Sequence, residues 1–422
     1  MLESDMSIDQ QIPNFDFETY ISNYEAKQAS PPLSIEAYKM AIQDIKEKTF
    51  QTTKYQRAME ALNAELTKQG QPTLPLDQQW LTETRKKSLT VFEQLEAQVK
   101  AAKQNFSKED IRVSQSQLGD YYYKKGDLPA ATKAYVRTRD HCTTSQHIIE
   151  MCFNTIQVYL DDQNFSHVVQ TYITRAESTP NIPDKTNTIS KLRCCQAVSL
   201  LGASDATSTY RAVAEALMEV SFESANSIHT IMSPNDVAIY GGLCALVSYD
   251  RRQLSQVLNN SNFKNFLVLE PSLHELLEAF YQSKYAVCFE LLSKYQQSLR
   301  LDVYLASHLA KLTQLVREKA MIQYCLPYSM IDMRKMAKAF DVSLEELENE
   351  LVHLIGKKDK IHARIDSHQK ILCTKKQERR VKAFEQSLLA GDEFERSSRA
   401  LLIRLHLLKA NLVVTQDPLS SK

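Results

Sequence analysis

The sequence predicts a mostly α-helical protein: a tetratricopeptide-like (TPR-like) α-solenoid arm, then a winged-helix module, then one long C-terminal helix. Three observations carry this prediction. Only 8 of the 422 residues are glycine, about 2% where about 7% is usual, and sheet-rich folds need more turns than this allows. Apolar residues recur at helical spacing, with a period-2 alternation near Ile361. A helix-pair motif also repeats in the first half of the chain.

Charge and apolar content exclude several classes of partner. The chain carries 51 basic and 51 acidic residues, so it has no overall attraction to nucleic acid or to an anionic membrane. No stretch of about eighteen apolar residues occurs, so no membrane span is expected. The acidic start lacks the features of a secretory signal. The eight cysteines are scattered, which favours reduced thiols. We therefore expect a protein of the cytoplasm and nucleus.

The N-terminal region alternates helices with breaks. We expect residues 1–15 to be disordered and a helical region to begin near Phe17 and to restart after Pro31–Pro32. The segment Thr67–Gln79 contains two prolines and predicts a loop. Apolar residues of the segment 89–99 belong to a longer helix after it.

The arm is predicted from a repeated helix pair. Its first copy has residues at the spacings of a tetratricopeptide unit: Leu118, Gly119, Tyr122, Ala131 and Tyr135. Gly119 and Ala131 would let two antiparallel helices approach, and the tyrosines would fill the gap between them. The same pattern recurs 37 residues later, where the equivalents of Tyr122, Leu128 and Tyr135 are Tyr159, Phe165 and Tyr172.

Later parts of the arm match this pattern less closely. Arg193–Val220 and Phe280–Tyr295 are two further candidate helix pairs, and Ser178–Ser190 is predicted to be a loop. Gly241–Gly242 lacks the additional glycines, or the following Lys-Ser/Thr pair, of a phosphate-binding loop. We expect these two glycines to serve close packing between helices. Stacked helix pairs of this kind typically bind other proteins along extended surfaces.

A winged helix is predicted after residue 300. Leu305, Leu309, Leu312 and Val316 form one helical stripe, which Pro327 ends. A short second stripe follows: Met333, Met336, Ala337 and Phe340.

A third helix of the module opens at Ser343, with Glu346 placed for a capping box. Its buried face is predicted to contain Leu344, Leu347, Leu351 and Leu354. Gly356 stands where a left-handed C-terminal stop is expected. A period-2 strand over 361–366, a turn at Ser367–Gln369 and a return strand over 371–373 then predict the wing.

The charges of the third helix argue against DNA binding. Acidic residues lie in or just before it, and no Lys or Arg occurs from Val342 to Ile355. A recognition helix must approach phosphates and relies on basic side chains to do so. Lysines and arginines between Lys357 and Arg380 supply a modest basic edge beside the wing, which an ordinary solvated rim explains. A protein-binding module is therefore favoured, and a winged-helix DNA-binding regulator remains an alternative of a different class.

The chain ends in a long helix, predicted from about Gln377 to about Val413, that is apolar on nearly all sides. Phe384 and Leu388 start an apolar face, and Leu401, Leu405, Leu408 and Leu412 are expected to continue it. Such a helix must be buried on several sides. We expect it to insert into a bundle built with helices of other chains. The candidate subunit-interaction residues are Ile361, Ala363, Ile365, Ile371, Phe384, Leu388, Leu401, Leu405, Leu408 and Leu412.

No catalytic or cofactor site is predicted. His141, Cys142, His147 and Cys152 lack the tight ligand pairs of structural zinc sites. His362 and His368 fall on a hairpin rather than on a metal-binding helix. No Gly-x-Ser-x-Gly elbow occurs. The chain is therefore expected to need no metal or cofactor and not to be an enzyme itself.

A helical-repeat arm that runs into a winged helix and a tail helix resembles the PCI-domain family. These are scaffold subunits of the proteasome lid, the COP-nine signalosome and a translation-initiation complex. Local runs such as "SPNDVAIYGGLCAL", "SKYAVCFELL", "LDVYLASHLAKL" and "ARIDSHQKIL" are similar to the signalosome's subunit-one branch. The resemblance extends from about Asp16 to Val414.

The resemblance implies domain limits and partners. The arm would span 16–300, the winged-helix part of the PCI domain 301–376 (the whole domain about 215–376), the bundle helix 377–414 and a tail 415–422. It implies a non-catalytic subunit supporting cullin deneddylation, with other PCI subunits and a JAMM-type metalloprotease subunit as partners and cullin-RING ligases as further contacts. Neither nucleic acid nor membrane is an expected partner. A proteasome-lid subunit of the same architecture is the alternative.

Overall fold

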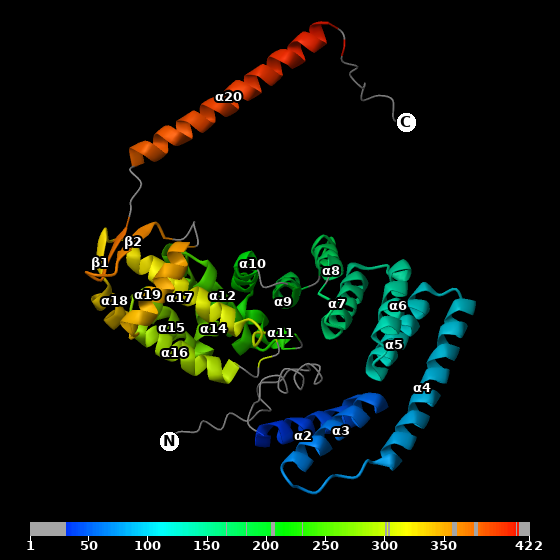
Figure 1. Ribbon diagram of the computed structural model, residues 1–422. Helices are drawn as coiled ribbons and strands as arrows, with labels where there is room; N and C mark the ends of the chain where they lie inside the picture. The colour runs from blue at the N-terminus through cyan, green and yellow to red at the C-terminus, as the bar shows by residue number, and fades with distance from the viewer. Residues whose placement is uncertain are drawn as a thin grey trace. The chain divides into compact units, whose positions relative to one another are not determined.

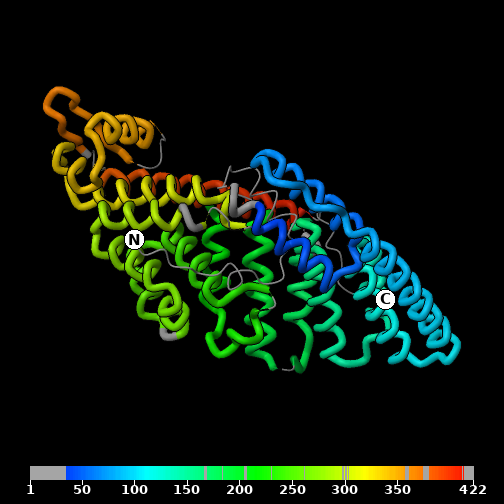
Figure 2. Tube along the Cα trace, turned by 90° about the horizontal axis from the view of Figure 1, so that it is seen from below, coloured from blue at the N-terminus to red at the C-terminus, as the bar shows by residue number. Residues whose placement is uncertain are grey.

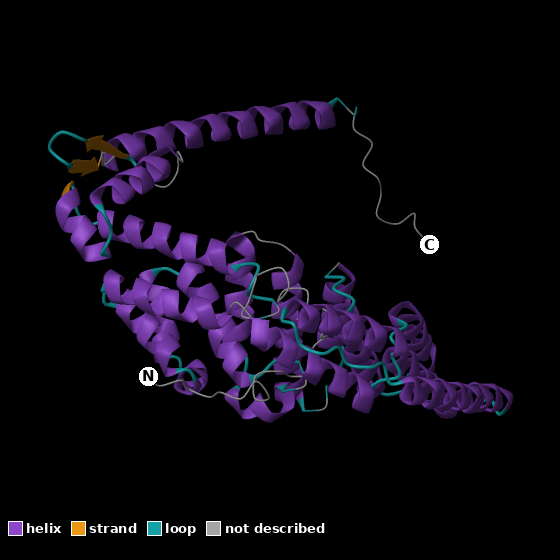
Figure 3. Cartoon of the chain, turned by 60° about the horizontal axis from the view of Figure 1, so that its bottom comes forward, coloured by secondary structure: helices purple, strands orange, loops and turns teal. Residues whose placement is uncertain are grey.

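The computed structural model describes residues 31–412, apart from 166, 183, 204–206, 230, 300, 301, 303, 357–360, 375–378 and 411. The described chain is almost entirely helical with one small sheet, as Figure 3 shows by colour. It divides into two compact units, one ending at Met321 and the other beginning at Ile322. The predicted fold class, a helical arm followed by a winged helix and a long last helix, is confirmed.

The first unit consists of helices, labelled in Figure 1. They are α2 (Pro31–Lys48), α3 (Thr52–Lys68), α4 (Gln78–Gln104), α5 (Lys108–Lys125), α6 (Leu128–Thr138), η2 (Arg139–His141), α7 (Ser145–Asp161), α8 (His167–Glu177), α9 (Lys185–Ala203), α10 (Thr207–Met218), η3 (Phe222–Ser224), α11 (Ala225–Ile228), α12 (Pro234–Ser248), α13 (Arg251–Asn259), α14 (Ser261–Leu269), α15 (Pro271–Tyr281), α16 (Tyr285–Ser298) and most of α17 (Leu309–Cys325). The predicted disordered segment 1–15 and the helix start near Phe17 lie outside the described residues.

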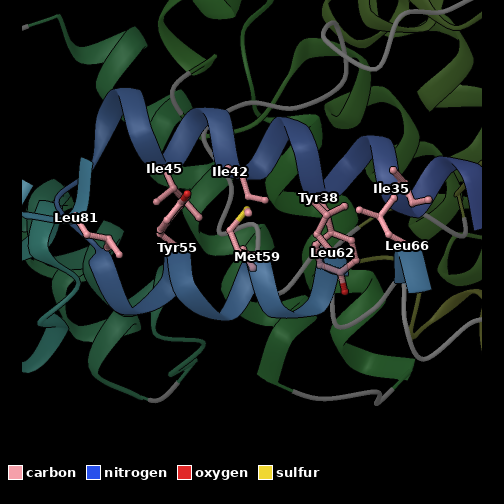
Figure 4. Packing of buried hydrophobic residues seen from close by; sticks show 10 residues of the cluster. Ile35, Tyr38, Ile42, Ile45, Tyr55, Met59, Leu62, Leu66 and Leu81 are labelled. Atoms are coloured by element: carbon pink, nitrogen blue, oxygen red, sulfur yellow. The ribbon is translucent and has the colours of Figure 1, made fainter. Parts of the chain in front are cut away.

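Helices α2 and α3 form an antiparallel hairpin with a core of its own. Figure 4 shows Tyr38 and Ile42 of α2 interleaved with Met59 and Leu62 of α3. Leu81 of α4 completes the same cluster. The turn of the hairpin is fixed to the α5–α6 turn, because the Phe50 N–H donates to the Lys124 carbonyl at 2.9 Å. The predicted loop between α3 and α4 is confirmed over the residues that separate the two helices.

The repeated helix pairs of the arm are confirmed. Helix α5 packs against α6, α6 against α7 and α7 against α8, and Figure 2 shows these helices following one another along the tube. A Cβ atom added at Gly119 would lie 2.5 Å from the Tyr135 ring, so only glycine allows this approach. The equivalent tyrosines of the second copy, Tyr159 and Tyr172, stack with ring centroids 6.3 Å apart.

Of the later candidate pairs, one is present, and two corrections are needed. Helices α9 and α10 cover the pair predicted at Arg193–Val220. The bounds Phe280–Tyr295 were wrong for a helix pair, because they hold most of α16 but only the last two residues of α15, the helix that packs against it. The segment Ser178–Ser190 was expected to be a loop throughout, which is wrong, because α9 already begins at Lys185. Ser190 and Thr188 are buried there, so tertiary packing overrides the weak helix propensity of this Ser/Thr-rich stretch.

Helix α12 packs against α10, α14 and α15. All its side chains from Val237 to Val247 are buried, so it is apolar on every side. A Cβ atom at Gly242 would lie 2.8 Å from a methyl carbon of Leu273, and one at Gly241 would lie 3.0 Å from the Phe263 ring. The prediction that these two glycines serve close helix packing is confirmed.

Two buried polar groups join α17 and the segment before it to the arm. The ammonium of Lys319 donates to the carbonyls of Leu246 and Tyr249, at the end of α12. These carbonyls have no partner within their own helix, so the lysine caps it. The ring of His308 contacts Tyr210 Oη at 3.0 Å through Nδ1 and the Leu201 carbonyl at 2.9 Å through Nε2.

The second unit is a winged helix followed by α20. Its elements are β1 (Met330–Asp332), α18 (Met333–Phe340), α19 (Leu344–Gly356), β2 (Ala363–Asp366), β3 (Ile371–Thr374) and α20 (Arg379–Lys409). The strand order is β1-β3-β2, and both pairs are antiparallel. The predicted core residues of α18 are buried, as are Leu347, Leu351 and Leu354 of α19, whereas Leu344 is half-buried.

Two details of this unit differ from expectation, and a third is confirmed in part. Strand β1 was not predicted, because it has only three residues. A strand this short shows no recognisable alternation of apolar and polar residues. Gly356 was expected to be left-handed, which is wrong: it is the last residue of α19 and its φ is not positive. Ser343 accepts a hydrogen bond from the Glu346 N–H at 3.3 Å, which supports one half of the predicted capping box.

Candidate subunit-interaction surfaces

The wing places four of the ten candidate residues in or beside a small sheet. Ala363 and Ile365 on β2 and Ile371 on β3 are half-buried. Strand β2 is an edge strand of the described sheet, so its outer backbone groups are available to a neighbour. Ile361 is only 7% exposed. Its side chain therefore offers less surface to a neighbour than those of the other three.

The wing turn is held to α19 by one glutamate. The Glu348 carboxylate accepts a hydrogen bond from Ser367 Oγ at 2.6 Å and lies 2.7 Å from the Lys370 ammonium. Both bonds stabilise the charged form, so they lower the pKa of Glu348 below its ordinary value. Lys370 has a φ of 57°, and its carbonyl accepts the Met333 N–H at 2.9 Å. The turn is thus fixed from α18 and from α19.

The exposed side of α19 is acidic. Glu345 and Glu346 are exposed and Glu350 is half-buried, and Asp341 precedes the helix in a left-handed conformation. In a DNA-binding winged helix this helix would enter the major groove. Its carboxylates would repel phosphates, so the geometry supports the sequence argument against such a role.

Helix α20 carries more exposed large apolar side chains than any other described element. All its described side chains are exposed except that of Ser398, which is half-buried. Phe384 is 64% exposed, Leu388 55% and Leu401 58%. Leu405, Leu408 and Leu412, the last three candidate residues, are exposed as well. Exposed apolar side chains in this number on one helix mark a binding site for another macromolecule.

Sequence reasoning missed a second exposed apolar group in this unit. Leu326 is 67% exposed, and Tyr328, Met330 and Val352 are also exposed. The first three lie on the connection from α17 into β1, and Val352 lies on α19. The signal was present in the residues "LPYSM", but Pro327 made the segment look like an ordinary turn.

The residues weighed as metal ligands have other surroundings. Cys142 Sγ donates to the Thr138 carbonyl at 3.3 Å. Cys152 is fully buried, and burial raises the pKa of its thiol to about 11. His147 Nδ1 lies 3.8 Å from a Glu109 oxygen. Within the described ranges no group of three or more His, Cys, Asp or Glu residues is placed to hold a metal ion.

None of the described helices is long and apolar enough for a membrane span.

Two family models match the chain in the two regions just described. Residues 77–257, most of the helical arm, match the model "26S proteasome subunit RPN7". Residues 292–376, from α16 to the end of the wing, match the model "PCI domain". The PCI match covers the strands and helices α17 to α19, which is where the winged helix lies.

Three curated relatives share much longer stretches. The chain is 42% identical over 316 residues to COP9 signalosome complex subunit 1 of Arabidopsis thaliana, covering 75% of this chain and 70% of the relative. It is 38% identical to subunit 1b of Drosophila melanogaster, covering 80% of this chain and 64% of the relative. It is 31% identical to subunit 1 of Emericella nidulans, covering 96% of this chain and 84% of the relative.

Proposed function

Because this chain belongs to the COP9 signalosome subunit 1 family, we propose that it is a non-catalytic scaffold subunit that supports the removal of a ubiquitin-like modifier from cullins. Through that activity it would regulate cullin-RING ubiquitin ligases. Its place would be in a multi-subunit complex with other PCI-domain subunits. The isopeptidase would be a JAMM-type metalloprotease subunit, and the complex would act in the cytoplasm and nucleus.

The exposed apolar surface of α20 is the observation that carries this proposal. A helix of about 46 Å, at about 1.5 Å per residue, with leucines on most of its sides, is stable in water only when other helices cover it. The half-buried wing residues Ala363, Ile365 and Ile371 would lie beside neighbouring winged helices. The mechanism is positional: the wing and α20 hold neighbouring subunits in register, so that the catalytic subunit meets its substrate.

Deleting α20 from Leu401 onward tests the scaffold role. We expect the truncated chain to fold with an unchanged melting temperature, since the described side chains at 401–410 and Leu412 are exposed, and to fail to co-purify with the other subunits. A complex assembled without this segment would contradict the proposal.

A second experiment tests the cullin part of the proposal. Reconstituted complex lacking the whole chain should lose at least tenfold in the rate of cullin deneddylation. Unchanged activity would contradict the cullin part of the proposal.

A proteasome-lid subunit is the second candidate, favoured by the match of the arm to the RPN7 model. Affinity purification of the tagged chain from its own cells distinguishes the two. The signalosome proposal predicts cullins and a JAMM subunit in the eluate without proteasomal ATPases.

A winged-helix DNA regulator would instead bind duplex DNA at low salt with a strong salt dependence. We expect the full chain to show no such binding.

A further inference from the structure

Side-chain hydrogen bonds join three parts of the first unit to the N-terminal end of α12. Tyr240 Oη donates to both carboxylate oxygens of Asp302, in the segment that follows α16, at 2.8 Å. Asn235 Nδ2 donates to Glu270 Oε1 at 3.0 Å, at the junction of α14 and α15. Glu270 Oε2 accepts the hydroxyl of Tyr295, on α16, at 2.8 Å. Two carboxylates from outside α12 are therefore held beside its first two turns.

Asp302 also fixes the short turn segment that leads into α17. Its Oδ1 accepts the N–H groups of Tyr304 at 3.0 Å and of Leu305 at 2.7 Å. Helix α17 begins at Leu309 and continues across the division between the two compact units. Loops open locally at a lower cost in free energy than core helices do. The segment 302–308 is thus the part of this cluster that can move, and the Asp302 carboxylate is one of the groups that hold it.

A third carboxylate, that of Asp236, lies at the same end of α12. It accepts the N–H of Ser233 at 3.3 Å and completes the capping box of the helix. Its charge is opposed by that of Asp302 and, less strongly, by that of Glu270. Burial and these two charges raise the pKa of Asp236 to about 7. Unlike an ordinary aspartate, Asp236 therefore gains or loses its proton near neutral pH.

Two buried phenols of the cluster keep their protons at neutral pH. Burial and the charge of Asp302 raise the pKa of Tyr240 well above its ordinary value. Burial and the hydrogen bond to Glu270 raise the pKa of Tyr295 as well. Both hydroxyls therefore remain donors near neutral pH, whereas the raised pKa of Asp236 falls within that range.

Other elements bring apolar side chains and two histidines to this region. Helices α10 and α14 meet α12 with apolar side chains such as Leu217 and Phe263. On α15, His274 lies one turn after Glu270, and its buried Nδ1 has no hydrogen-bond partner among the described residues. His308 ends the turn segment, and its ring nitrogens contact α9 and α10. An experiment that isolates Asp236 must therefore leave both histidines unchanged.

We propose that Asp236 is a proton-dependent switch for the segment 302–308: a neutral Asp236 leaves the segment bound to α12, and a charged Asp236 repels Asp302 and loosens it. A carboxyl that binds its proton more tightly in the closed arrangement destabilises that arrangement when the proton leaves. Opening lets Asp302 move away, which relieves the repulsion and frees the chain just before α17. The switch is a property of the chain itself, so it goes beyond the proposed scaffold function and its test does not depend on that function.

The test compares hydrogen–deuterium exchange of the full chain at pH 5.5 and pH 7.5, expressed as protection factors, which remove the intrinsic effect of pH on exchange. In the wild type, protection of the Tyr304 and Leu305 amides should fall by roughly tenfold between the two pH values. In Asp236→Asn, which has the same shape and no charge, protection should change little. Asp140→Asn removes an exposed carboxylate and should behave as the wild type. Equal falls in the wild type and in Asp236→Asn, or no fall in the wild type, would overturn the inference.

Two further variants decide the question if Asp236→Asn does not fold. Glu270→Gln removes a charge that opposes Asp236, so the pH at which protection falls should move lower. Tyr240→Phe removes a donor to Asp302, so protection of the segment 302–308 should be lower than in the wild type at both pH values. An unchanged midpoint in Glu270→Gln would overturn the role of Asp236. Unchanged protection in Tyr240→Phe would show that Asp302 does not bind the segment to α12, and would overturn the inference as well.

Discussion

Glu348 on α19 and Lys370 in the wing turn form an ion pair at 2.7 Å, although 22 residues separate them in the chain. Ser367 donates to the same carboxylate. This link orients the wing, and with it β2 and β3, relative to α19. A fixed orientation would favour the contact with neighbouring winged helices that we propose, because ordering the wing on binding would cost conformational entropy.

Replacing Lys370 with methionine should raise the pKa of Glu348 toward its ordinary value, since the first cause of its lowering is the bond to Lys370. A carboxylate with a lowered pKa contributes stability above its ordinary pKa of about 4.5, and this contribution is lost as the pH falls through the lower folded value. The stability difference between wild type and variant should therefore vanish in acid. NMR titration of the Glu348 carboxyl measures the shift, with Lys335→Met as control, and equal pKa values in all three proteins would contradict this account.

Gly119→Ala should lower the free energy of unfolding by about 1–3 kcal/mol, the usual cost of overpacking, because the new methyl group would meet the Tyr135 ring. Gly391→Ala is the matched control. Nothing lies within 4 Å of a Cβ atom at Gly391, and alanine favours an exposed helix by about 1 kcal/mol. Denaturant unfolding of both variants checks this prediction. An equal loss in both would show that Gly119 does not mark a close helix approach.

Asp236→Asn should change how stability depends on pH. Burial, together with the charges of Asp302 and Glu270, raises the pKa of Asp236 to about 7. From about pH 4, the ordinary value for an aspartate, to about pH 7, the unfolded chain releases a proton that the folded chain keeps. The free energy of unfolding of the wild type therefore falls as the pH rises from about 4 to about 7. That of the variant falls less. Asparagine still accepts the Ser233 N–H. Melting temperatures from pH 4 to pH 8 test this, with exposed Asp140→Asn as control, and parallel curves would contradict it.

Lys319→Met should destabilise the first unit by about 1–3 kcal/mol, because the carbonyls of Leu246 and Tyr249 would remain buried without a donor. Burial also lowers the pKa of Lys319 to about 8. Burying the charged ammonium therefore costs free energy, which its two hydrogen bonds offset. Lys264→Met, on the exposed side of α14, should have little effect. A melting temperature that is the same for both variants would exclude the capping role.

The sequence predicts the helices of this protein better than its junctions. Periodic stripes such as Met333, Met336 and Ala337 fix a buried face by themselves, because helical spacing determines which side chains share a side. Glycine contacts such as that of Gly119 follow from the repeat. The strand β1, by contrast, exists because it pairs with β3, and nothing local to Met330 signals that pairing.

The sequence predicts the exposure of the candidate interaction residues less consistently than it predicts the helices. The exposure of α20 could be predicted from its composition, because a single neighbouring surface cannot bury a helix that has leucines on most of its sides. The burial of Ile361 could not be predicted, because strand alternation shows which residues share a side, not which side faces the core.

Hydrogen–deuterium exchange over α20 tests the central claim most directly. The free chain and the assembled complex are compared over residues 379–409. If the apolar surface of α20 is covered only by other subunits, its amides should exchange rapidly in the free chain and become strongly protected in the complex, while those of α12 stay protected in both. Equal and strong protection of α20 in the free chain would mean that this chain covers its own last helix, and would contradict the account.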